Sequence, residues 1–245
     1  MPRVYALLGS LLLAAAVTAQ GETRTFLGRA YDPDSGRLLY TEQHRIKLDE
    51  RGGYISGSVT YLDPRGEPIA MKEVDFAGNQ TAPSFLYRDL RTDSLISVDS
   101  GESDLTVSYR DGGHERQTDL EIDREESIVI DAGFDRFIQQ EWQALLQGQT
   151  RSFLFLHVSR ARFMEFEIVK TGKIGDSVEF RIRPAGFILG LLVEPIRLTY
   201  AAEDRRLLRY QGVTNIAREA GGRVRDEHYV ATIEYEYLPI STRRY

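Results

Sequence analysis

The sequence predicts a mainly β protein with antiparallel strands and one amphipathic helix. Three observations lead to this fold class: apolar and polar side chains alternate in many segments, turn sequences rich in glycine and proline separate those segments, and one stretch has helical spacing. Successive side chains of a strand point to opposite faces of the sheet. The alternation therefore indicates strands with one buried face and one face in water.

The alternating segments define most of the chain. We expect strands near residues 24–31, 37–48, 53–62, 67–76, 94–99, 104–110, 116–122, 150–158, 162–170, 176–183, 195–201, 206–214 and 224–237. Short turns such as Asp63-Pro-Arg-Gly66 connect them, and connections this short join antiparallel neighbours. Residues 79–90 are ambiguous, and Pro83 argues against a central strand there because proline cannot donate to the ladder.

One segment has a helical period instead. From Gly133 the apolar residues recur every three or four positions, which predicts one helix of about four turns. Asp131 can cap its start, and Gly148 can end it. The apolar stripe should pack on a face of the sheet; it consists of Phe134, Phe137, Ile138, Trp142, Leu145 and Leu146.

The strand that follows supports this packing. Its residues Phe153 and Phe155 point to one face, while Leu154, Leu156 and Val158 point to the other. A strand with two apolar faces is covered on both sides. We expect the helix to cover one of them.

The first residues resemble a secretory signal peptide. Met1-Pro2-Arg3 is a basic start, the run from Val4 to Val17 is apolar, and small residues precede Gln20. Cleavage is expected after Ala19, leaving residues 20–245 as a single β-rich domain. The apolar run is shorter than the roughly 20 residues of a membrane-spanning helix, although a retained anchor is the alternative. No other stretch approaches that length, so we expect no membrane span in the mature chain.

Composition limits the cellular compartments and the kinds of partner that we expect for this protein. The chain contains no cysteine, which excludes disulfides, thiolate metal sites and a lipid anchor on a cysteine at the cleavage site. Export without disulfides suits the bacterial periplasm. The formal net charge of −6, without a basic stripe, argues against nucleic acid as a partner.

Catalytic signatures are missing from the sequence. We find no nucleophile motif, no phosphate-binding loop and no dinucleotide fingerprint, and the four histidines lack metal-ligand spacing. We therefore predict a protein that is not an enzyme and needs no metal or cofactor. His157 shares a strand face with Phe153 and could be a buried ligand or base, or a packed histidine. Glu165 and Glu167 share a face and could do acid–base work only if their environments separate their pKa values; otherwise they are ordinary surface charges.

Aromatic residues are the remaining functional signal. They could line an apolar cavity between helix and sheet, or simply fill a β core. The candidate lining residues are Phe134, Phe137, Trp142, Phe153, Phe155, His157 and Phe166.

The order of these features resembles the unclosed β-barrel proteins of the bacterial periplasm. These include the lipoprotein localisation factors of the LolA/LolB type and uncharacterised exported families. The segment from Gly133-Phe-Asp-Arg-Phe137 through Trp142 to Ser159-Arg160 is most similar to the uncharacterised ones. The resemblance implies a strongly curved antiparallel sheet, an unclosed barrel, wrapped around one amphipathic helix, with an apolar concave face. Unlike the lipoprotein factors, this chain opens with a strand.

Two functions follow from these expectations. The preferred one is a periplasmic binding or chaperone-like protein that shelters a lipid, an acyl chain or another apolar ligand, with the helix as plug or lid. The alternative is a structural or interaction protein of the envelope that docks a protein partner through strand edges or its wet face. A third function is that of a hydrolase or isomerase, which a pocket containing His157 with a carboxylate within hydrogen-bond reach would favour.

Overall fold

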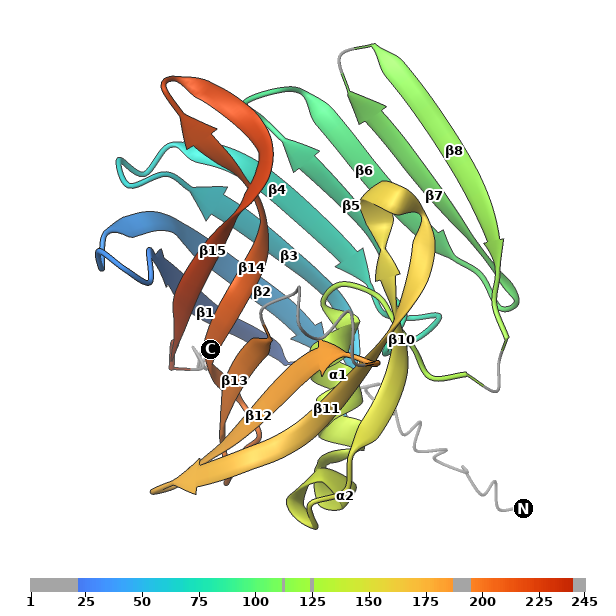
Figure 1. Cartoon of the computed structure of the whole chain (residues 1–245), viewed down its shortest axis with the longest axis vertical. Coiled ribbons are helices and arrows are strands. Elements are labelled where there is room, and N and C mark those ends of the chain that lie inside the picture. The colour runs from blue at the N-terminus through green and yellow to red at the C-terminus, as the bar shows by residue number, and fades with distance from the viewer. Residues whose placement is uncertain (1–21, 112, 124–125, 187–194, 240–245) are drawn as a thin grey trace, which may run out of the picture.

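One curved sheet dominates the structure. The computed structural model describes residues 22–111, 113–123, 126–186 and 195–239, so the predicted signal peptide and its cleavage site after Ala19 lie outside the described residues. Within these ranges the strands form one sheet of 15 strands in the order β8-β7-β6-β5-β4-β3-β2-β1-β15-β14-β13-β12-β11-β10-β9 (Figure 1). The predicted mainly β fold is confirmed.

The strands follow the predicted order along the chain. The first eight are β1 (Thr23–Tyr31), β2 (Leu38–Leu48), β3 (Tyr54–Leu62), β4 (Pro68–Asp75), β5 (Ser84–Asp89), β6 (Ser94–Ser100), β7 (Asp104–Asp111) and β8 (His114–Glu121). After a short segment the others are β9 (Ile128–Val129), β10 (Arg151–His157), β11 (Arg162–Ile174), β12 (Ser177–Pro184), β13 (Ile196–Ala201), β14 (Leu207–Ala220) and β15 (Arg223–Tyr237).

The sheet curls without closing. The first strand pairs with the last, with Gly28 opposite Tyr235, so the free edges are the mid-chain strands β8 and β9. All neighbouring strands are antiparallel except β9 and β10, which are parallel. The two edges are not paired with each other, which confirms the unclosed barrel (Figure 1).

Strand β5 corrects the prediction for residues 79–90. It is a central strand between β4 and β6, although Pro83 was expected to exclude one. Pro83 lies directly before the first strand residue, Ser84, so the ladder loses no donor.

The predicted single helix is wrong in detail. The chain forms two short helices, α1 (Gly133–Gln140) and α2 (Trp142–Leu146), which Glu141 separates. The Glu141 N–H still donates to the Phe137 carbonyl at 3.0 Å, while its carboxylate accepts from Arg151 Nε at 2.6 Å. Gly148, at φ +81°, follows the second helix as predicted. A single-turn 3-10 helix, η1 (Val158–Arg160), links β10 to β11.

Asp131 does not cap the first helix. The N-cap residue is Ala132, without a side-chain cap hydrogen bond. The carboxylate of Asp131 instead binds the buried ammonium of Lys72 in β4 and accepts from the Ala132 N–H.

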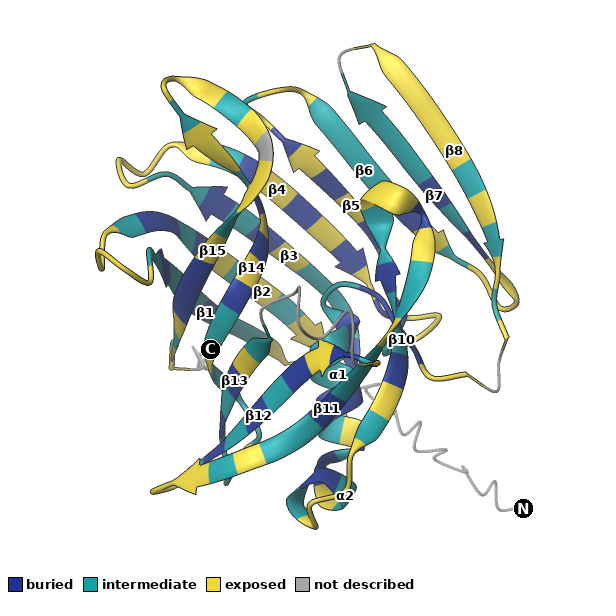
Figure 2. Ribbon diagram, viewed as in Figure 1, coloured by how far each residue is buried: buried dark blue, intermediate teal, exposed yellow. Residues whose placement is uncertain are grey.

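Two cores occupy the concave side of the sheet (Figure 2). The first lies beneath β2–β7 and contains residues from β9, β10 and the turn after η1, among them Ile128, Leu156 and Ala161. The second joins both helices to β9–β14. Strand β10 separates them, since Leu156 lies in the first core and Phe153 in the second. The prediction that this strand is covered on both faces, by the helices on one, is confirmed.

Candidate functional site

The predicted aromatic residues meet in the second core. Phe137, Trp142 and Phe153 are buried there. The Phe137 and Phe153 rings are 4.9 Å apart, and Trp142 lies 5.4 Å from Phe180 and 5.9 Å from Tyr200. Phe134, Phe155 and Phe166 are half-buried and pack against the same core. Six of the seven candidates are therefore brought together; their role as ligand lining stays a prediction.

His157 lies apart from them, at the end of β10. Its Nδ1 is 3.2 Å from Ser159 Oγ. Burial and the neighbouring charges of Arg160 and Arg162 hold the pKa of this histidine below its ordinary value. Of the two carboxylates considered with it, Glu165 is exposed, while Glu167 accepts from Arg183 Nη2 at 3.1 Å.

A buried ion pair on the concave face was not predicted. Lys72 Nζ donates to both carboxylate oxygens of Asp131, at 2.8 and 2.7 Å, and Asn215 Nδ2 donates to the same carboxylate at 3.0 Å. The Lys72 side chain is 4% exposed, and that of Asp131 is 11% exposed. Asp131 adopts φ +45°, a strained backbone region for a residue other than glycine. The pair ties the start of α1 to β4 and β14.

A second polar group lies on β2. Glu42 Oε2 is 2.7 Å from His44 Nε2 and accepts from the Tyr235 hydroxyl at 3.3 Å. Gly28 of β1 is paired with Glu42 in the strand register. A Cβ on Gly28 would lie 2.9 Å from Glu42 Oε2 and 2.8 Å from the Tyr235 ring. The glycine thus lets a carboxylate and a ring approach the backbone closely.

Tyrosines line the same face between these groups. The rings of Tyr40 and Tyr61 are 6.1 Å apart, and those of Tyr61 and Tyr87 are 6.3 Å apart. The buried Tyr87 hydroxyl has no hydrogen-bond partner among the described residues. Burial raises the pKa of Tyr87, so its hydroxyl remains protonated at neutral pH. A protonated phenol without a partner can bind a water molecule or a polar ligand atom.

A third polar group anchors the helices. Asp135 of α1 accepts hydrogen bonds from Tyr54 at 2.7 Å, Tyr200 at 2.9 Å and Gln139 at 2.9 Å. Burial raises the pKa of Asp135 and outweighs the hydrogen bonds, which lower it. Because Tyr54 begins β3 and Tyr200 belongs to β13, this carboxyl joins both halves of the sheet.

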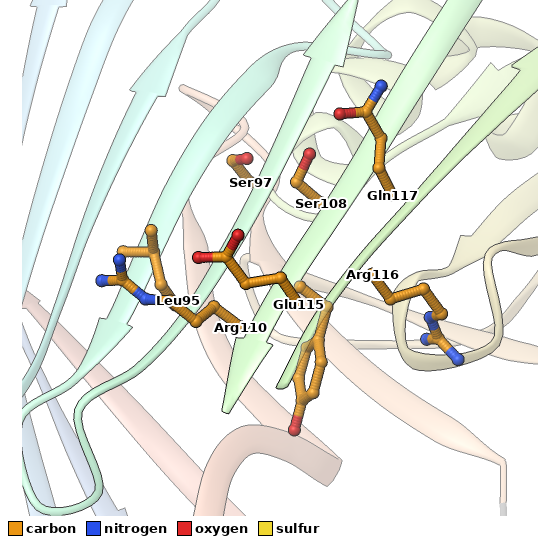
Figure 3. Close-up of a pocket in the computed structure, with 8 residues that line it drawn as sticks. Leu95, Ser97, Ser108, Arg110, Glu115, Arg116 and Gln117 are labelled. Carbon is orange, nitrogen blue, oxygen red and sulfur yellow. The ribbon is translucent and has the colours of Figure 1, made fainter. Parts of the chain in front are cut away.

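The sheet is hollowed on both sides near its β8 edge. One hollow of about 370 Å³ lies over β6–β8. Figure 3 shows most of its side chains, including Leu95, Ser97 and Arg110, on one face and Arg116 on the other. A second hollow, also about 370 Å³, is lined by Tyr109, His114, Glu115, Arg116 and Ser159.

We call the junction of β7–β8 with η1 the seam. The second hollow lies there. Arg116 Nη2 donates to the Ser159 carbonyl at 2.7 Å, and its guanidinium lies 5.9 Å from the Tyr109 ring centre. Below it, Leu120 of β8 and Val158 of η1 both pack against the first core. The edge strand β8 therefore contacts η1 at the seam through a side chain rather than through a strand ladder.

Two further properties bear on function. Among the described residues, no three or more histidine, aspartate or glutamate side chains cluster so that they could hold a metal ion. The part of the chain that the structure describes contains no helix long and apolar enough to span a membrane.

Comparisons with known proteins identify the fold. The chain matches no protein-family model and no curated protein. Its structure is similar to the crystal structure of a beta-barrel-like protein from Brucella abortus, a domain of unknown function called DUF1849. The TM-score is 0.50 at 8% sequence identity, over 89% of this chain and 96% of that chain. The protein therefore shares a beta-barrel-like fold with a family of unknown function.

Proposed function

We propose that the protein is a periplasmic binding or chaperone-like protein that shelters an amphipathic ligand with an apolar chain, such as a lipid. The observation that carries the proposal is the unpaired seam. Inner apolar side chains of β2–β7 are covered by β9, β10 and η1, and the free edges β8 and β9 are not joined by backbone hydrogen bonds. Layers held by side-chain packing can separate locally at a lower cost than paired strands.

The polar groups of the concave face fit the same role. A ligand that enters at the seam meets apolar side chains first and the Tyr87 hydroxyl and the Lys72–Asp131 pair deeper in the sheet. Ligand sites combine a mostly apolar lining with a few placed polar groups. Aromatic residues also meet where the helices pack on the sheet, Phe137 and Trp142 of the helices among them. They offer a second apolar surface, for which the helices would act as a plug.

The compartment and the carrier-like role rest on the sequence. The predicted signal peptide supports export of the mature chain to the periplasm. The sequence resemblance to unclosed barrels of the LolA/LolB type, from which this chain departs by opening with a strand, supports an apolar ligand. Fold likeness alone does not determine function, so the ligand must be sought directly.

Retained lipid is the test of this proposal. The mature chain should be purified from a bacterial periplasm without detergent and examined by native mass spectrometry and solvent extraction. We expect a bound lipid in about stoichiometric amount. The proposal fails if the protein is free of lipid and also does not bind a dansyl-labelled fatty acid in a fluorescence titration.

A second candidate function is supported by the convex face. Met71 and Leu86 are 46% and 37% exposed there. Leu86 lies opposite Ser97, which lines the hollow over β6–β8, and Met71 lies diagonally across the β4–β5 pair from Leu86. An exposed apolar surface beside a hollow can dock a protein partner of the envelope. Crosslinking in cells should then capture one stoichiometric partner, and Leu86→Glu should abolish that crosslink without unfolding the protein.

A further inference from the structure

The seam carries a cluster of basic side chains. Arg116 of β8 binds the backbone of Ser159, the residue before Arg160. Arg160 is exposed and is the last residue of η1. We call Arg116 and Arg160 the seam cluster. It brings together one residue from β8 and one from η1, which the sequence separates by about forty positions. His157 and Arg162 are paired across the β10–β11 hairpin and share the strand face of Phe153, which lies in the second core.

The nearby acids do not neutralise this cluster in the structure. Asp111, at the end of β7, accepts a hydrogen bond from the Tyr109 hydroxyl at 3.3 Å. Glu115 lines the hollow, but its side chain leaves the opposite face of β8 from that of Arg116 (Figure 3). Among the described residues, neither Arg116 nor Arg160 is paired with a carboxylate, and Arg116 donates to a backbone carbonyl.

Apolar side chains lie directly beneath these charges. Leu120, Val158 and Phe163 are half-buried and pack against the first core. A site with cations at its mouth and apolar side chains below them matches an anionic head attached to an apolar chain. Arginine suits such a head because its planar guanidinium offers paired donors to a carboxylate or phosphate.

We propose that the seam cluster binds the carboxylate or phosphate head of an anionic amphiphile whose chain enters the first core. This inference rests on the proposed function and names the ligand class that it would take. Arg116 and Arg160 would donate to the anionic oxygens while the chain passes between η1 and β8.

Paired probes test the head group. A dansyl-labelled fatty acid and its methyl ester should be titrated against the mature chain at low and high salt. We expect the acid to bind at least about fivefold tighter than the ester at low salt, and this preference to shrink at high salt because exposed charges are screened.

Variants locate the effect. Arg116→Gln combined with Arg160→Gln should remove most of the preference for the acid and leave ester binding unchanged. Arg110→Gln is the matched control, since Arg110 lies on the neighbouring strand β7 but opens onto the convex face (Figure 3). Circular dichroism should show that all variants are folded.

The outcomes test the head-group assignment and the proposed function separately. Equal binding of acid and ester that the double variant does not change overturns the head-group assignment but leaves the proposed function standing. Displacement of the acid by inorganic phosphate at the same concentration would make a free anion the ligand and overturns the amphiphile. Failure of both probes to bind overturns the proposed function together with this inference.

Discussion

Loss of Lys72 should destabilise the fold strongly. The Lys72→Met variant keeps the apolar stem of the side chain but removes the ammonium, which donates to Asp131 at 2.7 and 2.8 Å. Asp131, with a side chain only 11% exposed, would keep only the hydrogen bonds from Asn215 and from the Ala132 N–H. Leaving one partner of a buried pair uncompensated costs about 3–5 kcal/mol. That is a large fraction of the roughly 5–15 kcal/mol by which a domain is stable.

An exposed ion pair of the same length provides the control. Arg29 Nη1 lies 2.7 Å from Glu236 Oε2, but the two side chains are 42% and 58% exposed. Arg29→Gln should therefore cost less than about 1 kcal/mol. Both variants should be compared with the wild type by urea denaturation followed by circular dichroism, which gives the free energy of unfolding.

If Lys72→Met folds poorly, a double variant can still test the coupling between Lys72 and Asp131. Asp131→Asn tolerates the left-handed backbone and removes the buried charge. We expect Lys72→Met with Asp131→Asn to be more stable than Lys72→Met alone, with a coupling energy of at least about 1 kcal/mol. The reasoning is refuted if Lys72→Met costs no more than Arg29→Gln, or if the two substitutions at the buried pair add independently.

Three other predictions concern the helices. Alanine favours helices, but Gly133→Ala should destabilise the protein by more than about 1 kcal/mol, because the new Cβ would lie 1.9 Å from the Thr81 carbonyl oxygen. Gly57→Ala is the control, since its Cβ would have its nearest neighbour at 3.7 Å, and urea denaturation should show no such loss for it. Burial raises the pKa of Asp135, so the native state holds this proton more tightly than the unfolded chain, and the resulting stability is present below about pH 3.9 and is lost as pH rises through the raised pKa. Asp135→Asn should therefore gain stability relative to wild type as pH rises above about 4, and the opposite trend in denaturation curves would contradict this. Trp142→Ala should cost about 3–5 kcal/mol, since the ring is 2% exposed, and a thermal melt that it leaves unchanged would show that the ring is not part of the core.

The alternation of side chains predicted most of the sheet from the sequence. It works for β15 and β10 because burial on one or both faces leaves a two-residue period in the local sequence. The helix pair was predicted as one element because the three-to-four spacing continues through Glu141. The break at Glu141 is accompanied by the ion pair with Arg151, which spacing does not reveal.

The polar groups of the site could not be predicted in the same way. Lys72 and Asp131 are 59 residues apart in the sequence, and their contact depends on how the sheet curls. A local signal did exist for Glu42 and His44, because they occupy the same strand face as the buried Tyr40 and Leu48. The basic seam arises from β8 and η1 together, so neither segment alone indicates it.

Locking the seam is the most direct test of the central claim. The natural chain contains no cysteine, so cysteines at His114 and Ser159, which line the same hollow, can be joined specifically by a flexible bis-maleimide. We predict that the uncrosslinked double variant takes up a dansyl-labelled fatty acid and that the crosslinked form takes it up much more slowly or not at all. Equal uptake by both forms would contradict ligand entry through the seam.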